Sequence, residues 1–465
     1  MPHHDLVIIG SGSGNSLLTP ELDGLDVAIV EKGTFGGTCL NVGCIPTKMF
    51  VVPADRVLEA HDAHRLGVTF APPTVDWPAI RDRIFGRIDP ISAGGEAYRD
   101  SQEHVTLYRT RARFSGDRRL ALDTGEEVTA DRVVVASGSR PNGLDVEGLR
   151  QAGPDRGVHT SDTVMRLDAL PARMAVVGGG FVACEMAHVF SALGVHVTQV
   201  QRSATLLTHE ETEIAQRYTE VARHHYDVRL HTTVSSAEHT AGVWRLATEG
   251  PGGPAHVEAE VVLLAVGRRP NTDLLDPAAG GLETSDDDLL VVDDQLRTTA
   301  PGVWALGDIC STHQLKHVAN HEARIVAHNL AVDTGRLEAA PLVVDDRPVP
   351  HAVFGHPQVA SFGPTAAQLD EAGTRFVTKT QAFGDVAYGW ALEDTTGLLT
   401  VHASPDGTIL AAHALGPHAS TVIQPLIQAA SFGQHATEVA RGQYWIHPAL
   451  AEVVENALLG LPLDD

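Results

Sequence analysis

A strand, a glycine-rich turn and a second strand occur twice in this chain, and this repeat restricts the fold more than any other feature. The first copy runs from the apolar residues 6–9 through the glycine-rich residues 10–15 to a strand at 27–30. Glycines there allow a tight turn and let backbone N–H groups approach a pyrophosphate, while an acid after the second strand accepts hydrogen bonds from a ribose. The first copy therefore predicts a dinucleotide site with these ligands: Gly10, Gly12, Gly14 and Glu31.

The second copy begins with the apolar residues 175–177, continues with the glycines 178–180 and ends in a strand at 195–200. Two copies in a chain of 465 residues predict two dinucleotides bound by separate parallel sheets. Gln201 and Arg202 follow the second strand, where an acid would select an unmodified ribose. Because arginine pairs with phosphate, Arg202 is predicted to bind a ribose that carries a 2′-phosphate.

A third pattern, between the two copies, combines cysteines with glycines. Cys39 and Cys44 are separated by four residues and open a predicted apolar helix through residues 49–52. A thiolate at a helix N-terminus is stabilised by the backbone N–H groups and the helix dipole. A pair of inert core cysteines would not need the three glycines at 36, 37 and 43, and a zinc site would need a second Cys or His pair. The pattern predicts a redox-active cysteine pair and no metal.

Residues 36–48 read Gly-Gly-Thr-Cys-x-Asn-x-Gly-Cys-x-Pro-x-Lys, which resembles the signature of the class I pyridine nucleotide-disulfide oxidoreductases. Three further segments extend the resemblance over nearly the whole chain. Residues 136–141 resemble the family's crossing between domains, residues 298–308 its second FAD motif, and residues 445–452 its His-Pro-x-x-x-Glu motif. The resemblance implies FAD at the first fingerprint and NADPH at the second, with NADH tolerated.

The resemblance also implies roles for individual residues. Cys39 would be the interchange thiol and Cys44 the charge-transfer thiol of a disulfide beside the flavin. His447, charged by Glu452, would reach the disulfide of the partner subunit, so that a homodimer shares its active sites. Lys48 and Glu185 would pair near the flavin, as a further catalytic pair. The remaining implied cofactor contacts are Gly37, Thr38, Lys48, Gly138, Gly178, Gly180, Phe181, Gly267 and Asp308.

Within the family, residues 10–15 and 85–96 are similar to the mycothione reductases, which predicts mycothione as the substrate. The predicted substrate contacts are Arg87, Asp89 and Ser92. The alternative for residues 85–96 is a kinked helix that only packs. No cysteine follows Cys310, so the internal disulfide would meet a small substrate directly.

Two alternatives to this function are open. Dihydrolipoamide dehydrogenase shares the cysteine motif, but that enzyme normally carries an acid where Gln201 stands. A flavoprotein with a structural docking role belongs to a different class, and the intact cysteine, histidine and glutamate positions disfavour it. An assay with NADPH and a panel of disulfides separates these functions.

The resemblance implies an α/β fold of two Rossmann-like domains, for FAD and NADPH, and a C-terminal α+β dimerisation domain. The expected boundaries are 1–148 for the FAD domain, 149–268 for the NAD(P)H domain, 269–340 for the second FAD segment and 341–465 for the dimerisation domain. Local patterns predict a helix after residues 10–15, a helix from residue 76 that breaks at Pro90, Gly94 and Gly95, a strand meander at 105–128, strands at 349–359 and 377–389, and a helix at 421–432.

Charge and cysteine content limit partners and compartment. The net charge of −25 disfavours nucleic acids and anionic membranes as partners. Four cysteines do not form a secreted disulfide framework, and residues 1–5 lead directly into a strand without a signal-peptide pattern. No apolar run is long enough to span a bilayer. These features predict a cytoplasmic protein with a small-molecule disulfide as its substrate.

Overall fold

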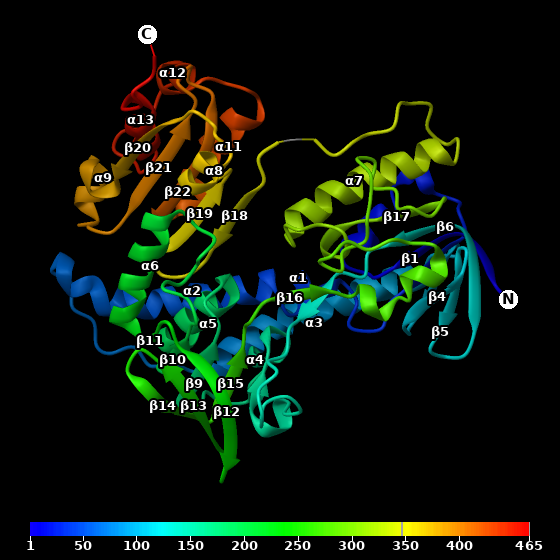
Figure 1. Ribbon diagram of the computed structural model, residues 1–465, viewed down its shortest axis with the longest axis horizontal. Coiled ribbons are helices and arrows are strands. Elements are labelled where there is room, and N and C mark those ends of the chain that lie inside the picture. Colours follow the sequence, from blue (N-terminus) through cyan, green and yellow to red (C-terminus); the bar gives the residue numbers. More distant parts are fainter. Residues whose placement is uncertain (346, 465) are drawn as a thin grey trace. The chain divides into compact units, whose positions relative to one another are not determined.

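The computed structural model describes residues 1–345 and 347–464, which cluster into two compact units (Figure 1). The first unit comprises residues 1–49, 78–142 and 267–345. The second comprises residues 50–77, 143–266 and the described residues from 347 onward. The four-part division with boundaries at 148, 268 and 340 stays a prediction.

The first unit contains a mixed sheet. Its strands are β1 (His3–Ile9), β2 (Val27–Val30), β3 (Val105–Tyr108), β4 (Ala112–Gly116), β5 (Arg119–Leu122), β6 (Glu127–Val135) and β17 (Val303–Ala305). Their order is β3-β2-β1-β6-β5-β4, and β17 also pairs with β6. The pairs β3–β2, β2–β1, β1–β6 and β6–β17 are parallel. The meander predicted at 105–128 is found only in part: β4, β5 and β6 form an antiparallel meander, whereas β3 pairs in parallel with β2 and lies outside it. A two-stranded ribbon of β7 (Ser139–Pro141) and β16 (Arg268–Pro270) completes this unit's strands.

Both faces of this sheet are buried because β1 is apolar at every position from Leu6 to Ile9. On one face, Leu6 and Ile8 cluster with the helix α7 (Lys316–Asp333), which lies along the sheet in Figure 1. On the other face, Val7 and Ile9 cluster with residues of β4 and β5. The remaining helices that begin or lie mainly in this unit are α1 (Gly37–Asn41), α2 (Cys44–Asp62) and α3 (Trp77–Asp100).

The predicted helix after the first glycine-rich turn is much shorter than expected. The structure has only a 3₁₀ helix at Ser13–Leu17, followed by another at Pro20–Leu22. Pro20 has no N–H to donate and disfavours a helical conformation at Thr19. The chain therefore crosses from β1 to β2 through two short turns instead of one α-helix.

The predicted break in the helix that begins near residue 76 is wrong. Helix α3 continues through Pro90, Gly94 and Gly95 to Asp100. Its buried residues recur at helical spacing along one stripe, which holds the helix together through tertiary contacts. That stripe consists of Ile84, Phe85, Ile88, Ser92 and Arg99.

The second unit opens with a parallel sheet. Its strands are β8 (Val158–His159), β9 (Arg173–Val177), β10 (His196–Val200), β11 (Asp227–Arg229) and β15 (Val261–Leu264), and their order is β11-β10-β9-β15-β8. The helices are α4 (Ser161–Val164), α5 (Phe181–Ala192) and α6 (Thr212–His225). A separate antiparallel sheet contains β12 (Thr233–Thr240), β13 (Val243–Gly250) and β14 (Gly253–Ala259).

The C-terminal part of the second unit is an antiparallel sheet in the order β18-β19-β22-β21-β20. The strands are β18 (Pro350–Val353), β19 (Gln358–Phe362), β20 (Val377–Ala382), β21 (Leu398–Ala403) and β22 (Ile409–Gly416). The helices are α8 (Ala366–Glu371), α9 (Ala387–Ala391), α10 (Ala419–Val422), α11 (Gln424–Ser431), α12 (Ala436–Arg441) and α13 (Glu452–Leu459). Helices α10 to α13 pack on the apolar face of the sheet.

Three C-terminal predictions need correction. The segment predicted as strand at 349–359 contains β18 and the start of β19, two antiparallel strands joined by a turn, and β19 continues to Phe362. The predicted strand at 377–389 ends at Ala382, where the chain turns into a 3₁₀ helix at Phe383–Asp385 and then into α9. After this turn the backbone of Gly389 lies so close to Phe383 that a Cβ on Gly389 would be 1.8 Å from the Phe383 carbonyl oxygen. The predicted helix at 421–432 is two helices, α10 and α11, and Pro425 stands in the first turn of α11. The predicted α/β fold class with a C-terminal α+β domain is confirmed. Within residues 1–345 and 347–464, no helix has both the length and the apolar character needed to cross a membrane.

Candidate active site

The first glycine-rich turn has a backbone that only glycine fits. Gly10 has a φ of +105°, and a Cβ there would lie 2.3 Å from the carbonyl oxygen of Ala136. A Cβ on Gly14 would lie 2.9 Å from the side chains of Ile8 and Ala136. The turn therefore lies directly against the ends of β1 and β6.

Glu31 is fixed at the end of β2 by three hydrogen bonds. One carboxylate oxygen accepts from the backbone N–H of Ser11 at 2.9 Å and from its hydroxyl at 2.7 Å. The other oxygen accepts from the N–H of Gly33 at 2.7 Å. The acid that the sequence predicts as a ribose ligand thus also ties the glycine-rich turn to the second strand.

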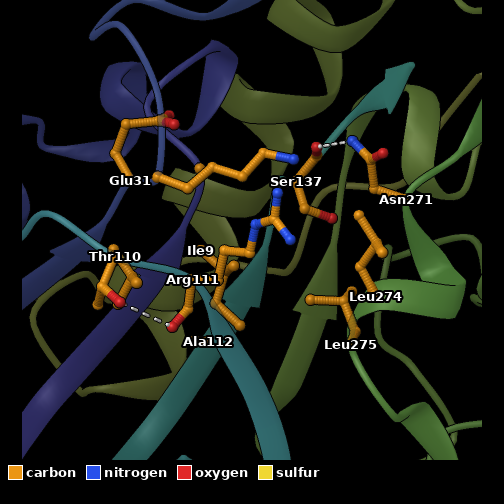
Figure 2. Close-up of a pocket in the computed structure, with 12 residues that line it drawn as sticks. Ile9, Glu31, Thr110, Arg111, Ala112, Ser137, Asn271, Leu274 and Leu275 are labelled. Atoms are coloured by element: carbon orange, nitrogen blue, oxygen red, sulfur yellow. Dashed lines mark hydrogen bonds between the residues drawn. The ribbon is translucent and has the colours of Figure 1, made fainter. Parts of the chain in front are cut away.

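A cavity of about 70 Å³ lies beside Glu31 (Figure 2). Its walls combine apolar side chains with Glu31, Arg111 and Asn271, and Figure 2 shows the amide of Asn271 directed at Ser137, to whose carbonyl oxygen it donates at 2.7 Å. The hydroxyl of Ser137 is buried without a hydrogen-bond partner among the described residues. Apolar walls, a carboxylate and an unpaired hydroxyl fit the adenosine half of FAD. The apolar residues are Ile9, Val30, Ala112, Leu274 and Leu275.

Arg111 and Asn271 were not among the predicted site residues. Arg111 lies between two strands and belongs to no motif, so no sequence signal marks it. Asn271 directly follows residues 267–270, which include the predicted cofactor contact Gly267, and this position was the available signal.

The cysteine motif packs against the glycine-rich turn. A Cβ on Gly37 would lie 2.6 Å from the Cα of Gly12, and the N–H of Gly36 donates to the hydroxyl of Ser11 at 2.9 Å. Gly36 and Gly37 have φ values of +99° and +71°. The glycines therefore bring α1 and the dinucleotide turn into direct backbone contact, and Thr38 lies exposed in the first turn of α1.

The two motif cysteines stand on different helices. Cys39 lies within α1, and Cys44 is the first residue of α2. Both are thiols here, and the pKa of Cys39 is raised, chiefly by its hydrogen bond to Cys44 and next by burial. Lys316 acts in the opposite direction on Cys39 and donates to the hydroxyl of Ser13 at 2.8 Å. The two thiols are hydrogen-bonded to each other. Cys44 stands at a helix N-terminus, a position that stabilises a thiolate.

Asp308 is held by the crossing between the two sequence copies. The hydroxyl of Ser139 donates to Asp308 at 2.6 Å, and the guanidinium of Arg268 donates to that hydroxyl at 2.9 Å. The crossing glycines Gly138 and Gly267 have φ values of +66° and +102°. Asp308, half-buried in the 3₁₀ helix Gly307–Ile309, is thus placed by residues from two distant segments.

The second glycine-rich turn repeats the geometry of the first. Gly178 has a φ of +129°, and a Cβ there would lie 2.2 Å from the carbonyl oxygen of Ala265. Gly180 directly precedes α5, whose first residue, Phe181, is exposed. This is the arrangement that leaves a helix N-terminus open to a phosphate.

Gln201 and Arg202 differ in their exposure to solvent. Gln201 is buried, its amide donates to the carbonyl oxygen of Thr205 at 3.3 Å, and a Cβ on Gly179 would lie 2.4 Å from that amide nitrogen. Arg202 is exposed. Of the two residues, only Arg202 presents a solvent-exposed charged group just after the end of β10.

Glu185 is buried on α5 and accepts the N–H of Phe354 at 2.8 Å. Lys48 lies half-buried on α2. The predicted pairing of Lys48 with Glu185 stays a prediction.

His447 and Glu452 form a preorganised pair near the C-terminus. Nδ1 of His447 lies 2.7 Å from one carboxylate oxygen of Glu452, and the other oxygen accepts the N–H of Ala449 at 3.1 Å. The hydrogen bond from His447 lowers the pKa of Glu452. Glu452 therefore orients the ring through Nδ1. The Nε2 edge stays accessible, because 70% of the His447 side chain is exposed.

The three predicted substrate contacts lie on α3 but not on one face. Arg87 and Asp89 are exposed. Ser92 is buried, and its hydroxyl donates to the carbonyl oxygen of Phe35 at 2.6 Å. Ser92 therefore has a structural role in holding α3 against Phe35. Its predicted contact with the substrate stays a prediction.

Two family models match the chain. The model described as "Pyridine nucleotide-disulphide oxidoreductase" matches residues 4–323, and the model described as "Pyridine nucleotide-disulphide oxidoreductase, dimerisation domain" matches residues 349–458. Together these matches cover most of the chain.

Several curated proteins are similar over their whole length. Mycothione reductase of Mycobacterium tuberculosis (strain ATCC 25618 / H37Rv) is 48% identical over 99% of this chain and 100% of its own. Mercuric reductase of Streptomyces lividans is 34% identical, with 96% and 93% covered. Dihydrolipoyl dehydrogenase of Haloferax volcanii is 31% identical, with 98% and 96% covered.

Among solved structures, the HOCl-induced flavoprotein disulfide reductase RclA from Escherichia coli superposes with a TM-score of 0.85. It is 25% identical, and the match covers 98% of this chain and 99% of that one. The fold is therefore shared along the complete chain, including the C-terminal sheet.

Proposed function

This chain belongs to the pyridine nucleotide-disulphide oxidoreductase family, and we propose that within it the protein reduces mycothione with NADPH. Membership makes it a flavin-dependent disulfide reductase that uses FAD and NAD(P)H. The observation that carries the substrate is the 48% identity with a mycothione reductase over the full length. Identity with a dihydrolipoyl dehydrogenase is 31%, so that alternative has less support.

The residues of the first unit fit FAD. Backbone N–H groups of the turn at Gly10, Gly12 and Gly14 would face its pyrophosphate, Glu31 its adenosine ribose, and Asp308 its ribityl chain. Gly37, Thr38 and Lys48 would line the flavin, and Gly138 would let the backbone of the crossing lie close to FAD. When bound, FAD supplies a two-electron relay between the nicotinamide and the disulfide.

In the second unit, the turn at Gly178 and Gly180 would receive the pyrophosphate of NADPH, and Phe181 would cover the nicotinamide pocket. Arg202 would bind the 2′-phosphate, and Gly267 would let the backbone lie close to the nucleotide. Glu185 would pair with Lys48 to tune the flavin.

The thiols carry out the substrate half-reaction. The Cys39 thiolate attacks one sulfur of the disulfide, so a Cys39–substrate bond forms and the first thiolate leaves. His447, polarised by Glu452, protonates that leaving thiolate. The Cys44 thiolate then attacks Cys39, which breaks the Cys39–substrate bond, re-forms the Cys39–Cys44 disulfide and releases the second thiolate, which takes its proton from water. Because the pKa of Cys39 is raised beside Cys44, the mechanism needs a base near Cys39, and His447 has that role.

The partner arrangement follows from the C-terminal domain. The chain contains the family's dimerisation domain, and we propose a homodimer in which His447 acts on the disulfide of the other subunit. The domain boundaries predicted from the sequence are retained in this proposal. The cytoplasm is the proposed compartment, because four cysteines outside any disulfide framework suit a reducing environment.

Replacing Arg202 by Ala should raise KM for NADPH about tenfold to a hundredfold and leave KM for NADH nearly unchanged, since one charge-assisted hydrogen bond is lost. Steady-state kinetics with both nucleotides measures the effect. Arg223→Ala, at an exposed arginine of α6, is the matched control and should change neither value. An equal loss with both nucleotides would show that Arg202 does not bind the 2′-phosphate.

At fixed NADPH, kcat/KM for mycothione should exceed that for oxidised glutathione and for lipoamide by at least about a hundredfold. Sites built to hydrogen-bond a sugar disulfide reject analogues that leave polar groups unpaired. A preference for lipoamide would overturn the substrate. Arg87→Ala and Asp89→Ala should raise KM for mycothione, and Arg83→Ala, one turn earlier on the exposed side of α3, should not. Silent substitutions at both positions would move substrate recognition away from α3.

A further inference from the structure

One face of the C-terminal sheet carries a polar patch that the redox chemistry does not use. In the sheet register, His351 pairs with Ser361, Ser361 with His413, and His413 with Thr400, while His402 pairs with Thr378. Directly paired residues share a face, so these side chains lie together opposite the apolar face. Ser361, Thr400, His402 and His413 are at most 4% exposed. Such a concentration of buried imidazoles and hydroxyls needs polar partners.

Two adjacent glutamates from the segment before α6 meet this face. Glu210 is fully engaged: one carboxylate oxygen lies 2.6 Å from Nε2 of His351, and the other accepts the hydroxyl of Ser361 at 2.7 Å. Glu211 accepts the N–H of Ala366 at 2.8 Å and lies 3.4 Å from Nε2 of His402. Figure 1 shows α6 beside the sheet, and residues of both share an apolar cluster.

His413 has a buried nitrogen without a partner. Its Nε2 lies 3.2 Å from the carbonyl oxygen of Pro364, whereas its Nδ1 has no hydrogen-bond partner among the described residues. A carbonyl oxygen only accepts, so the proton of the neutral ring is on Nε2 and the lone pair is on Nδ1. Burial lowers the pKa of His413, which favours this neutral form, and Glu210, Glu211 and His402 are the charged or titratable groups that act on it.

We propose that Glu211, His402 and His413 bind a zinc-like divalent transition metal. One ligand atom from each residue lies within 4.8 Å of the others. Two imidazoles and a carboxylate are a preferred donor set for Zn²⁺, whereas Mg²⁺ and Ca²⁺ prefer oxygen ligands. In a tetrahedral site with bonds of about 2.1 Å, the ligand atoms lie about 3.4 Å apart. Small side-chain movements, of roughly 1 Å, would bring the three ligand atoms from their present spacing to this one.

The surroundings of the two imidazoles match those of metal ligands. Such histidines typically use their second nitrogen to bond a carbonyl or another polar group. Here Nε2 of His413 is bonded to the carbonyl of Pro364, and Nδ1 of His402 lies 2.8 Å from the hydroxyl of Thr378. The metal would link the segment before α6 to β21 and β22, as a structural connection independent of the flavin and of the substrate.

The test uses the FAD-containing enzyme with Cys39→Ser and Cys44→Ser, which removes the redox thiols as competing ligands. After chelator treatment, equilibrium dialysis against Zn²⁺ and elemental analysis should give one tight equivalent per chain, and Mg²⁺ should give none. Adding Zn²⁺ should also raise the Tm. If no tightly bound Zn²⁺ is found, or if Zn²⁺ does not raise the Tm, the proposal is overturned before any ligand variant is made.

Variants then assign the ligands. Glu211→Gln and His413→Asn should each lose the tight equivalent and the Tm shift, with FAD content as the check on folding. His351→Asn is the matched control, because it lies on the same face but bonds Glu210, and it should keep both. Binding that persists in Glu211→Gln, or that is lost in His351→Asn, would overturn the assignment. If His413→Asn does not fold, Glu211→Gln alone tests the ligand assignment, because Glu211 is only partly buried and its replacement disturbs the core less.

Discussion

Replacing Cys44 by Ser should abolish disulfide reduction, by at least about a thousandfold, and also remove the thiolate–flavin charge-transfer absorbance on two-electron reduction. Cys44 is the first residue of α2, where the helix N-terminus stabilises a thiolate. Without its sulfur, the bond that regenerates the internal disulfide cannot form. Anaerobic titration with NADPH, followed by absorbance at wavelengths beyond the flavin's own bands, measures the second effect.

Cys39→Ser is the matched control for this prediction. It should lose disulfide reduction to the same extent but keep the charge-transfer absorbance, because the Cys44 thiolate is still present. The other thiols do not compensate, since burial raises the pKa of Cys184 to about 12 and also raises that of Cys310. A charge-transfer band that survives in Cys44→Ser, or that disappears in Cys39→Ser, would reverse the assigned roles.

Replacing His447 by Ala should lower kcat for disulfide reduction by about 10²–10⁴-fold, the usual contribution of a general acid–base group. Hydride transfer from NADPH to the enzyme should be nearly unchanged, because the proposed role of His447 is confined to the thiol steps. Stopped-flow reduction by NADPH and steady-state turnover separate the two half-reactions. A variant that is slow in both would show that His447 has another role.

Subunit exchange tests whether His447 acts across the dimer. Mixing Cys39→Ser chains with His447→Ala chains yields heterodimers with one intact site, so complete exchange should restore about a quarter of wild-type activity. The control mixes His447→Ala with Glu452→Gln. These two residues lie 2.7 Å apart on one chain, so neither site of that heterodimer is intact and no activity should return. Verified exchange without recovery in the first mixture would exclude action in trans.

Local features of the sequence were enough to locate the dinucleotide turns and the cysteine motif. Gly10 and Gly178 both adopt φ values that favour glycine and approach a neighbouring carbonyl within a distance that excludes a Cβ. Such requirements act over a few residues, so they are visible in the sequence itself. The same holds for His447 and Glu452, which are five residues apart and in direct hydrogen bond.

Local patterns failed where distant contacts outweighed them. The expected break at Pro90 does not occur, because the buried stripe of α3 and the hydrogen bond from Ser92 to Phe35 hold the helix. Conversely, the expected helix after the first turn is reduced to 3₁₀ turns, where Pro20 removes a donor within a short connection. Propensity decides only where tertiary packing is weak.

The sequence by itself located the two glycine-rich turns, the Cys39–Cys44 motif and the His447–Glu452 pair, because each depends on neighbouring residues. The tertiary structure alone decided which distant groups share a site. It placed Lys316 near Cys39, joined Asp308 to Ser139, and assembled Glu211, His402 and His413 from segments nearly 200 residues apart. The physical reason is that strand pairing and sheet packing fix these contacts. The alternation along a strand shows which face a residue takes, but it does not show which distant residue lies opposite.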